Sequence, residues 1–383
     1  MVSALLLLAC GDDDGEVPAD VGGRDAQLED GGSDAGDDAA TDALGDAAPI
    51  ECTAATWEGC VYQPEDHPIA EVEGYFVEQV TFRRRFPILV RYPTDVAGPL
   101  PVVLASHGGT FNDSGHTLLR PWGRTLAQAG YAVIHMAHLQ PDDEGLMRFC
   151  MELGVPIGRC SFDDFSPQVA AKAIDAVAVL DDADGVGAWF ETETGMTLDL
   201  SRAATVGWSG GSQTGMTLLG AVRNLDDEGR LTFTLPDARV VGALALSVQG
   251  PGFSGYFEGA DGTSMDGVVS PLLIGTGDND YKAAANPDLT PAVRRTTYEN
   301  LPGADGQQRL FYSQLPLDTG GHETYHLDDL DHEDEQVRRA SFALQSVGRA
   351  FMDATLRGNT DATAYLDSTD AVTLAGPAEL LQR

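Results

Sequence analysis

The 383-residue sequence has few basic residues: 23 lysines and arginines stand against 60 aspartates and glutamates, for a net charge of −37 at pH 7. This excess of negative charge argues against nucleic acid as a partner and against electrostatic docking on anionic lipid. The sequence also lacks a glycine-rich phosphate loop, a dinucleotide fingerprint, a calcium-loop pattern and zinc-type histidine spacing. We therefore expect no metal and no cofactor.

The apolar run at residues 1–10 is too short to span a bilayer as a helix. It ends in Leu7-Leu8-Ala9-Cys10, which resembles the lipobox of bacterial lipoprotein signal peptides, although no lysine or arginine precedes it. The resemblance implies a lipidated Cys10, and a cleaved ordinary signal peptide is the alternative. We expect a protein of the cell envelope or cell surface, or a secreted one, that touches the membrane only through a lipid anchor.

Residues 11–50 contain 13 aspartates and glutamates, one arginine and no aromatic residue. Such a segment cannot bury enough apolar surface to offset the entropy lost on ordering, so we predict a disordered acidic tether. It carries −12 of the net charge, and the rest of the chain carries the other −25. The predicted organisation is a signal segment (1–10), the tether (11–50) and one folded domain (51–383), which we expect to be a monomer.

Apart from Cys10, the sequence has four cysteines, in the two close pairs Cys52/Cys60 and Cys150/Cys160. Outside the cytosol these would oxidise. Four cysteines allow three pairings, of which the local one, Cys52–Cys60 with Cys150–Cys160, closes the shortest loops. A metal site is the alternative, but neither spacing resembles a zinc knuckle.

Apolar segments that are typical of strands buried on both faces alternate with segments of helical periodicity. This order predicts an α/β domain with a mostly parallel, doubly wound sheet, helices on both faces, and functional groups at the carboxyl ends of the strands. Residues 138–165 are expected to be irregular, and Ile174, Val177 and Ala178 to form the apolar face of the helix that opens at Ser166-Pro167. The expected strands are 75–82, 86–92, 101–106, 131–137, 202–206, 239–247, 271–274 and 309–315, and the last expected helix is 332–357.

Residues 207–211, Gly-Trp-Ser-Gly-Gly, fit the Gly-x-Ser-x-Gly pattern of a nucleophile elbow. A strand-like segment precedes them and a helix-like segment rich in small residues follows, which is the context that the motif requires. The glycines leave room where strand and helix nearly touch. The pattern indicates that Ser209 is a nucleophile.

A serine hydroxyl needs a base within hydrogen-bond reach, and the base needs an orienting carboxylate. His322 follows the last predicted strand after two glycines and is the first candidate base, with His326 as its rival. The acid lies in the loop after the 271–274 strand: counting from Pro271 favours Asp280, and Asp278 is the alternative. The chain order serine, aspartate, histidine then matches one known arrangement of such triads.

From about residue 75 to residue 357 the chain resembles the α/β-hydrolase superfamily, and within it the compact ester hydrolases near dienelactone hydrolase, chlorophyllase, platelet-activating-factor acetylhydrolase and the cutinase-like enzymes. The resemblance implies the α/β-hydrolase fold and a serine carboxylic ester hydrolase that acts through an acyl-enzyme on small or polymeric esters. Dienelactone hydrolase itself has a cysteine nucleophile, so its lactone chemistry is not implied. The segments that carry the resemblance are 106–109 (Ser-His-Gly-Gly), 126–131 (Leu-Ala-Gln-Ala-Gly-Tyr), 207–211, 277–280 (Gly-Asp-Asn-Asp) and 320–322 (Gly-Gly-His).

An oxyanion hole needs two backbone N–H groups aimed at the developing charge. The elbow supplies that of Gly210, and the resemblance implies that of Gly109, with Thr110 as the alternative. Residues 249–270 contain six glycines, too many for a stable helical cap, so we expect an open site. The candidate substrate-binding residues are Trp208, Phe253, Tyr256 and Phe257, although the aromatic residues of this loop can instead pack on the core.

Two other functions fit the same sequence. A peptidase or amidase can use the same fold and triad. A binding lipoprotein on an inactive hydrolase fold is also possible, but the presence of Ser209, an acidic loop and His322 together argues against it.

Overall fold

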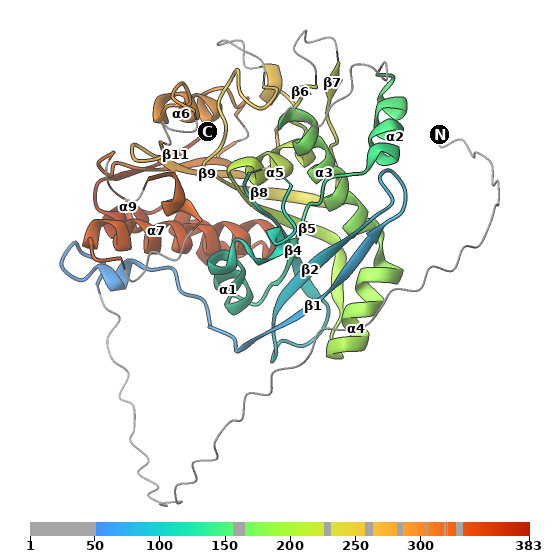
Figure 1. Cartoon of the computed structure of the whole chain (residues 1–383). Helices are drawn as coiled ribbons and strands as arrows, with labels where there is room; N and C mark the ends of the chain where they lie inside the picture. The colour runs from blue at the N-terminus through green and yellow to red at the C-terminus, as the bar shows by residue number, and fades with distance from the viewer. Residues whose placement is uncertain are drawn as a thin grey trace, which may run out of the picture. The chain divides into compact units, whose positions relative to one another are not determined.

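The computed structural model describes residues 51–109, 111–155, 165–225, 231–256, 263–281, 286–303, 305–317, 319, 321–326 and 332–383. Residues Pro49–Arg383 form one unit by their internal contacts, and Figure 1 shows its sheet and helices. Several sequence-based predictions lie outside the described residues: those on the signal segment with Cys10, on the tether, and on Thr110, Cys160, Phe257 and Gly320.

The described residues contain a nine-stranded sheet in the order β1-β2-β4-β3-β5-β8-β9-β10-β11. Neighbouring strands from β4 to β10 are parallel, while β1 and β2 at one edge and β11 at the other are antiparallel to their neighbours. The predicted mostly parallel α/β sheet is confirmed at this level. The strands are β1 (Ile69–Glu78), β2 (Arg84–Pro93), β3 (Leu100–Ser106), β4 (Ala132–Met136), β5 (Leu198–Trp208), β8 (Val240–Leu246), β9 (Leu272–Gly277), β10 (Gln308–Ser313) and β11 (Ala378–Gln382), and a separate pair is β6 (Arg223–Asn224) and β7 (Thr232–Phe233).

The central strands are apolar at nearly every position because both faces of the sheet are covered. In β3, Val102 and Leu104 belong to one hydrophobic cluster, and Val103 and Ala105 belong to the other. The first cluster includes α3 (Phe165–Asp181), α5 (Ser212–Leu218) and α6 (Pro291–Glu299), and the second includes α1 (Arg120–Gln128), α7 (Glu335–Met352) and α9 (Asp370–Ala375). Figure 1 shows α1 and α7 near each other, apart from α3 and α5. The remaining helices are α2 (Asp143–Leu153), α4 (Ala188–Thr194) and α8 (Thr360–Leu366).

The segment 138–165, expected to be irregular, contains α2, so this prediction was wrong. Asp142 caps the helix by accepting a hydrogen bond from the Gly145 N–H, and Gly154 ends it at φ +70°. Residues after α7 form α8, α9 and β11, which the sequence analysis did not predict. Short elements carry too few residues for their periodicity to be recognised.

The predicted apolar face of α3 is only part of its buried surface. Ile174, Val177 and Ala178 are partly buried and pack against the first cluster, while Ala170 and Ala173 are fully buried. Helix α3 carries small residues on the side that packs against the sheet and α5, because small side chains let the helix approach closely.

Cys52 and Cys60 form a disulfide. Cys150 is also disulfide-bonded, and its predicted partner Cys160 lies outside the described residues. Within the described segments, no helix is both long enough and apolar enough to cross a membrane.

Candidate active site

Ser209 lies at the carboxyl end of β5, where the chain turns through a 3-10 segment (Ser209–Gly211) into α5. Its φ of +51° is a left-handed value that non-glycine residues rarely adopt, and such strain is typical of functional turns. A Cβ on Gly207 would lie 2.2 Å from the Gly211 carbonyl oxygen, and one on Gly211 would lie 1.9 Å from the Ser106 carbonyl oxygen. Only glycine fits at either position, so the motif builds a sharp turn that leaves Ser209 partly exposed.

Asp280 follows β9, and His322 follows β10 in a short 3-10 segment (Gly321–Tyr325). The His322 Nδ1 lies 2.6 Å from Asp280 Oδ1, and the other carboxylate oxygen accepts a hydrogen bond of 2.7 Å from Thr276 Oγ1. Asp280 is fully buried. The structure therefore brings the predicted acid and base together.

The alternative acid, Asp278, has a different environment. It is exposed and accepts a hydrogen bond of 2.6 Å from the Tyr312 hydroxyl. Burial raises the pKa of Tyr312, and this hydrogen bond raises it further. Asp278 thus binds a tyrosine on β10, and the carboxylate against His322 belongs to Asp280.

Arg294 in α6 ties this part of the site together and was missed by the sequence analysis. Its Nη1 donates to the carbonyl oxygens of Ser247 (2.8 Å) and Val248 (2.7 Å), and its Nε donates to the Asp280 carbonyl oxygen (3.1 Å). Its Nη2 lies 3.3 Å from His322 Nδ1. Burial lowers the pKa of Arg294, and the nearby Asp280 carboxylate opposes this shift. An arginine in a polar helix carries no sequence signal for such a role.

Trp208, the residue before the serine, contacts both candidate histidines. Its Nε1 donates to the His322 carbonyl oxygen at 3.2 Å, and its ring stacks on His326 with centroids 3.7 Å apart. Ser209 Oγ lies 3.4 Å from Gln249 Nε2, its one hydrogen-bond partner among the described residues. Trp208 therefore links the turn at Ser209 directly to the segment that carries His322.

The loop after β3 lies against the turn at Ser209–Gly211. Gly109 is exposed and has a left-handed φ of +68°. Gly108 is buried, and a Cβ there would lie 2.2 Å from the Trp208 ring. The predicted oxyanion donors Gly109 and Gly210 thus belong to two loops in direct contact, since Gly211 also packs against the Ser106 and His107 carbonyls.

The aromatic residues of the 249–270 loop differ from one another. Phe253 is partly exposed. Tyr256 is only 3% exposed, and its hydroxyl contacts the buried Arg223 and the Met216 sulfur. Tyr256 therefore packs on the core, which was the alternative to its predicted substrate-binding role.

A second row of serine, histidine and aspartate lies behind the loop after β3. His138 Nε2 lies 3.0 Å from Ser106 Oγ, and His138 Nδ1 lies 2.9 Å from Asp175 Oδ2. Ser106 Oγ also bonds Thr214 Oγ1 at 2.9 Å. We call these residues the Ser106 row, and Ser209, His322 and Asp280 the Ser209 row. Ser106 is 1% exposed and the other two members are 0% exposed, so no substrate reaches the Ser106 row.

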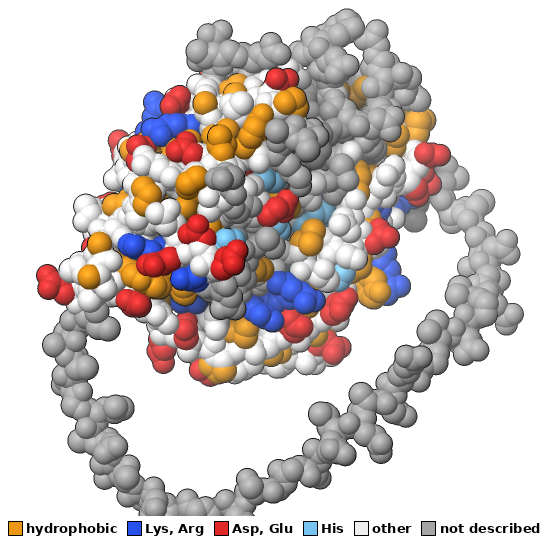
Figure 2. Space-filling view, turned by 60° about the vertical axis from the view of Figure 1, so that its left-hand side comes forward, with side chains coloured by type: hydrophobic (Ala, Val, Ile, Leu, Met, Phe, Trp, Pro, Cys, Tyr) orange, Lys and Arg blue, Asp and Glu red, His pale blue; other side chains and the backbone are white. Residues whose placement is uncertain are grey.

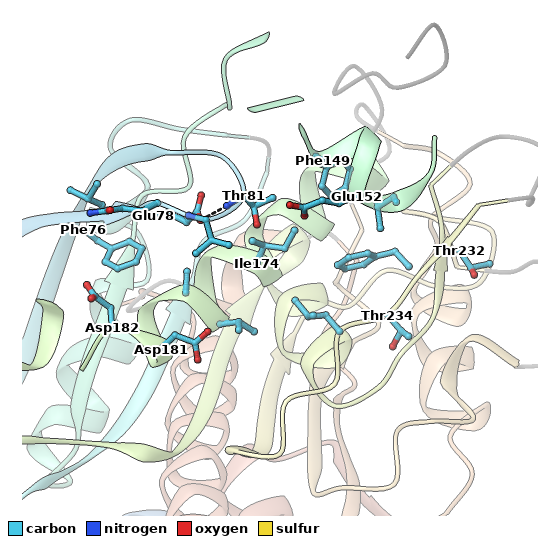
Figure 3. A pocket seen from close by; sticks show the side chains of 18 residues that line it. Phe76, Glu78, Thr81, Phe149, Glu152, Ile174, Asp181, Asp182, Thr232 and Thr234 are labelled. Atoms are coloured by element: carbon cyan, nitrogen blue, oxygen red, sulfur yellow. Dashed lines mark hydrogen bonds between the residues drawn. The ribbon is translucent and has the colours of Figure 1, made fainter. Parts of the chain in front are cut away.

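A cavity of about 820 Å³ has no member of either row among its lining residues (Figure 3). Phe76, Phe149 and Ile174 contribute to its apolar lining, and Glu152 and Asp182 contribute carboxylates. Glu78 also lines the cavity, but its carboxylate accepts the backbone N–H groups of residues 80–83. The described residues that line this cavity include no serine, cysteine or histidine.

Acidic side chains are spread over the face shown in Figure 2, basic ones form smaller groups, and histidines reach the surface near its middle. The described residues contain no group of three or more histidine, cysteine, aspartate or glutamate side chains placed to hold a metal ion.

No model of a known protein family matches the sequence, and no curated protein is detectably similar to it.

Proposed function

We propose that the protein is a serine carboxylic ester hydrolase of the α/β-hydrolase type. The observation that carries the proposal is the Ser209 row: a serine on a strained turn at the end of a central strand, with an Asp280–His322 pair that two following strands deliver to the same edge of the sheet. The carboxyl ends of parallel strands are where ligands bind in open α/β sheets.

In the proposed reaction, Ser209 Oγ attacks the ester carbonyl carbon while His322 Nε2 takes its proton. His322 then gives the proton to the leaving alcohol, and water releases the acid from the acyl-enzyme by the same route. Asp280 holds the tautomer in which Nδ1 carries the proton and stabilises the imidazolium that forms. The backbone N–H groups of Gly210 and Gly109 bind the negative oxygen of the tetrahedral intermediate.

The described part of the connection from β8 to β9 supports a site without a helical cap, since its one regular element is a 3-10 turn (Thr263–Met265). An open site favours short or medium acyl esters, or exposed esters of a polymer, over long-chain triglyceride droplets. Rates on tributyrin across its solubility limit test this: we expect no jump at droplet formation, and a sharp rise would contradict an open site.

A panel of p-nitrophenyl esters of graded chain length, assayed beside an aminoacyl p-nitroanilide, tests the reaction class. We expect turnover of esters with little on the anilide. Faster turnover of the anilide would favour a peptidase or amidase, and no turnover together with no labelling by a fluorophosphonate would favour an inactive binding protein.

The proposal also places the enzyme at the cell envelope through Cys10. Mass spectrometry of the exported protein tests this, since a diacylglyceryl mass on Cys10 is expected. A mature N-terminus without lipid would contradict the anchor and leave the reaction unaffected.

A further inference from the structure

Lys172, in the middle of α3, is one of two lysines in the whole sequence, and its side chain is 0% exposed. Burying an ammonium group is costly unless hydrogen bonds replace its water shell. Burial lowers the pKa of Lys172 to about 7, and the nearby Asp175 carboxylate opposes this shift. The position therefore carries a cost that packing alone does not explain, because a methionine would fill similar space without it.

The Lys172 ammonium group binds the loop that follows β3. Its Nζ donates to the carbonyl oxygens of His107 and Gly109, each at 3.0 Å. The carbonyl oxygen between them, that of Gly108, accepts a hydrogen bond of 2.8 Å from His107 Nδ1. Three consecutive carbonyl groups of the loop are thus held by side chains.

In a planar trans peptide the C=O and the following N–H point in opposite directions. Holding the His107 and Gly108 carbonyls therefore directs the N–H groups of Gly108 and Gly109 away from the side chains that bind those carbonyls. The bond from Lys172 to the Gly109 carbonyl fixes the peptide on the other side of Gly109. Because glycine has no Cβ and is conformationally free, these bonds replace a restraint that the residue itself does not supply.

The same turn of α3 holds the Ser106 row. Asp175, three residues after Lys172, contacts Arg84 and lies 2.9 Å from His138 Nδ1. His138 in turn holds Ser106, the residue at which β3 ends. Helix α3 therefore anchors the start of the loop through the Ser106 row and its glycines through Lys172.

We propose that Lys172 is a positioning residue for the oxyanion hole: it orients the peptides around Gly109 so that the Gly109 N–H, together with that of Gly210, meets the negative oxygen of the intermediate. This inference rests on the proposed function. Since the oxyanion exists only in the transition state and the intermediate, losing its orientation lowers turnover more than substrate binding.

The test compares K172M, which keeps the side-chain length and removes the donors, with wild type and with R309M. Arg309 is a suitable control because it is also a buried cation, and it donates to the Leu366 carbonyl oxygen. It lies on β10, four strands from β3 in the sheet. In K172M we expect kcat/KM to fall roughly 100-fold with KM nearly unchanged. The affinity for a trifluoromethyl ketone, which forms an oxyanion on Ser209, should fall by a similar factor, while R309M changes neither quantity. A folded K172M with wild-type affinity for the trifluoromethyl ketone would overturn the proposal.

K172Q provides the second variant if K172M does not fold: its amide keeps N–H donors on a shorter, uncharged side chain, so an intermediate loss is expected. Hydrogen–deuterium exchange of a peptide that covers residues 104–109 gives a readout that does not depend on activity. Faster exchange there in the Lys172 variants, and not in R309M, supports the anchoring even if wild type hydrolyses no ester and Ser209 is unreactive. Unchanged exchange in the variants refutes the anchoring even if wild type proves to be an active esterase.

Discussion

The Ser209 row and the Ser106 row contain the same three residue types and lie at the same edge of one sheet, but they differ in how completely their atoms are bonded. In the Ser106 row, His138 uses both ring nitrogens, and Ser106 Oγ has two partners. In the Ser209 row, within the described chain, Ser209 Oγ has one long contact, and the hydrogen bonds of the His322 ring are all at Nδ1. A fully bonded row stabilises a fold, and an incompletely bonded one keeps atoms free for a substrate.

Backbone conformation and exposure separate the rows further. Ser209 has a left-handed φ of +51° and is partly exposed, whereas Ser106 ends a regular strand and is 1% exposed. The composition of a triad therefore does not identify a catalytic one, and we propose that the triad with the strained, accessible serine is the catalytic one. The following predictions test this difference.

Removing each serine hydroxyl should give the largest contrast. Ser209→Ala should lower turnover by a factor on the order of 10⁶, because the nucleophile is lost. Ser106→Ala should keep activity within about tenfold and lower the free energy of unfolding by about 1–3 kcal/mol, because His138 Nε2 and Thr214 Oγ1 lose a buried partner. Ester assays and urea denaturation of both variants measure this.

Labelling by a fluorophosphonate provides the control for this pair. The probe should modify Ser209 in wild type and in Ser106→Ala, and no residue in Ser209→Ala. Modification of Ser106 would show that the two rows have been assigned the wrong roles.

Removing one or the other candidate acid should give a smaller difference in turnover than removing one or the other serine hydroxyl. Asp280→Asn should lower turnover roughly 10⁴-fold, because an amide no longer holds the right tautomer of His322. Asp278→Asn, the matched change two residues away, removes an exposed carboxylate that binds Tyr312, so a change of less than about tenfold is expected. If Asp278→Asn were the crippled variant in ester assays, the pairing with His322 would have no catalytic meaning.

The loop that follows β3 should tolerate very little extra side-chain volume at Gly108. Gly108→Ala places a Cβ against the Trp208 ring, so we expect a loss of about 1–3 kcal/mol in the free energy of unfolding, together with reduced turnover. Gly187→Ala is the control: Gly187, like Gly108, has no positive φ, and a Cβ there would make only an ordinary contact of 3.6 Å with Leu200 Cδ1. Equal stability changes in the two variants, measured by denaturant titration, would mean that the contact with Trp208 does not restrict Gly108.

The smallest predicted effect is the pH dependence that the Ser106 row gives to stability. Burial lowers the pKa of His138 well below its ordinary value, so His138 stays neutral in the folded protein while the unfolded chain binds a proton below about pH 6.5. His138 therefore contributes stability above that pH that is lost as the pH falls, by about 1.4 kcal/mol per pH unit. Asp175 acts in the opposite direction, because burial raises its pKa to about 7 and the folded protein binds its proton more tightly. The charged groups near His138 are Arg84 and Lys172. The neighbouring His107 is neutral in the folded protein, because burial lowers its pKa well below its ordinary value.

His138→Gln tests this contribution, because glutamine does not titrate. Stability curves from urea titrations at pH 7, 6 and 5 should fall less steeply for His138→Gln than for wild type, by about one proton in the slope. Parallel curves would show that His138 has an ordinary pKa in the folded protein.

The sequence determined the elements whose chemistry is local. Val102 to Ala105 form a strand buried on both faces because nearly every residue is apolar, and the glycines around Ser209 predict a sharp turn because no larger residue fits there. The order of Ser209, Asp280 and His322 along the chain, with each residue after a strand, also predicted which groups would meet at one edge of the sheet.

Only the tertiary structure decided what depends on side chains from distant segments. It placed His322 against Asp280 and Asp278 against Tyr312, enclosed Tyr256 in the core, and joined Ser106, His138 and Asp175 into a buried row. It also brought Lys172 to the loop after β3, a contact between residues more than 60 positions apart. Hydrogen bonds of this kind form between elements that the fold packs together, and a pattern within one segment carries no information about them.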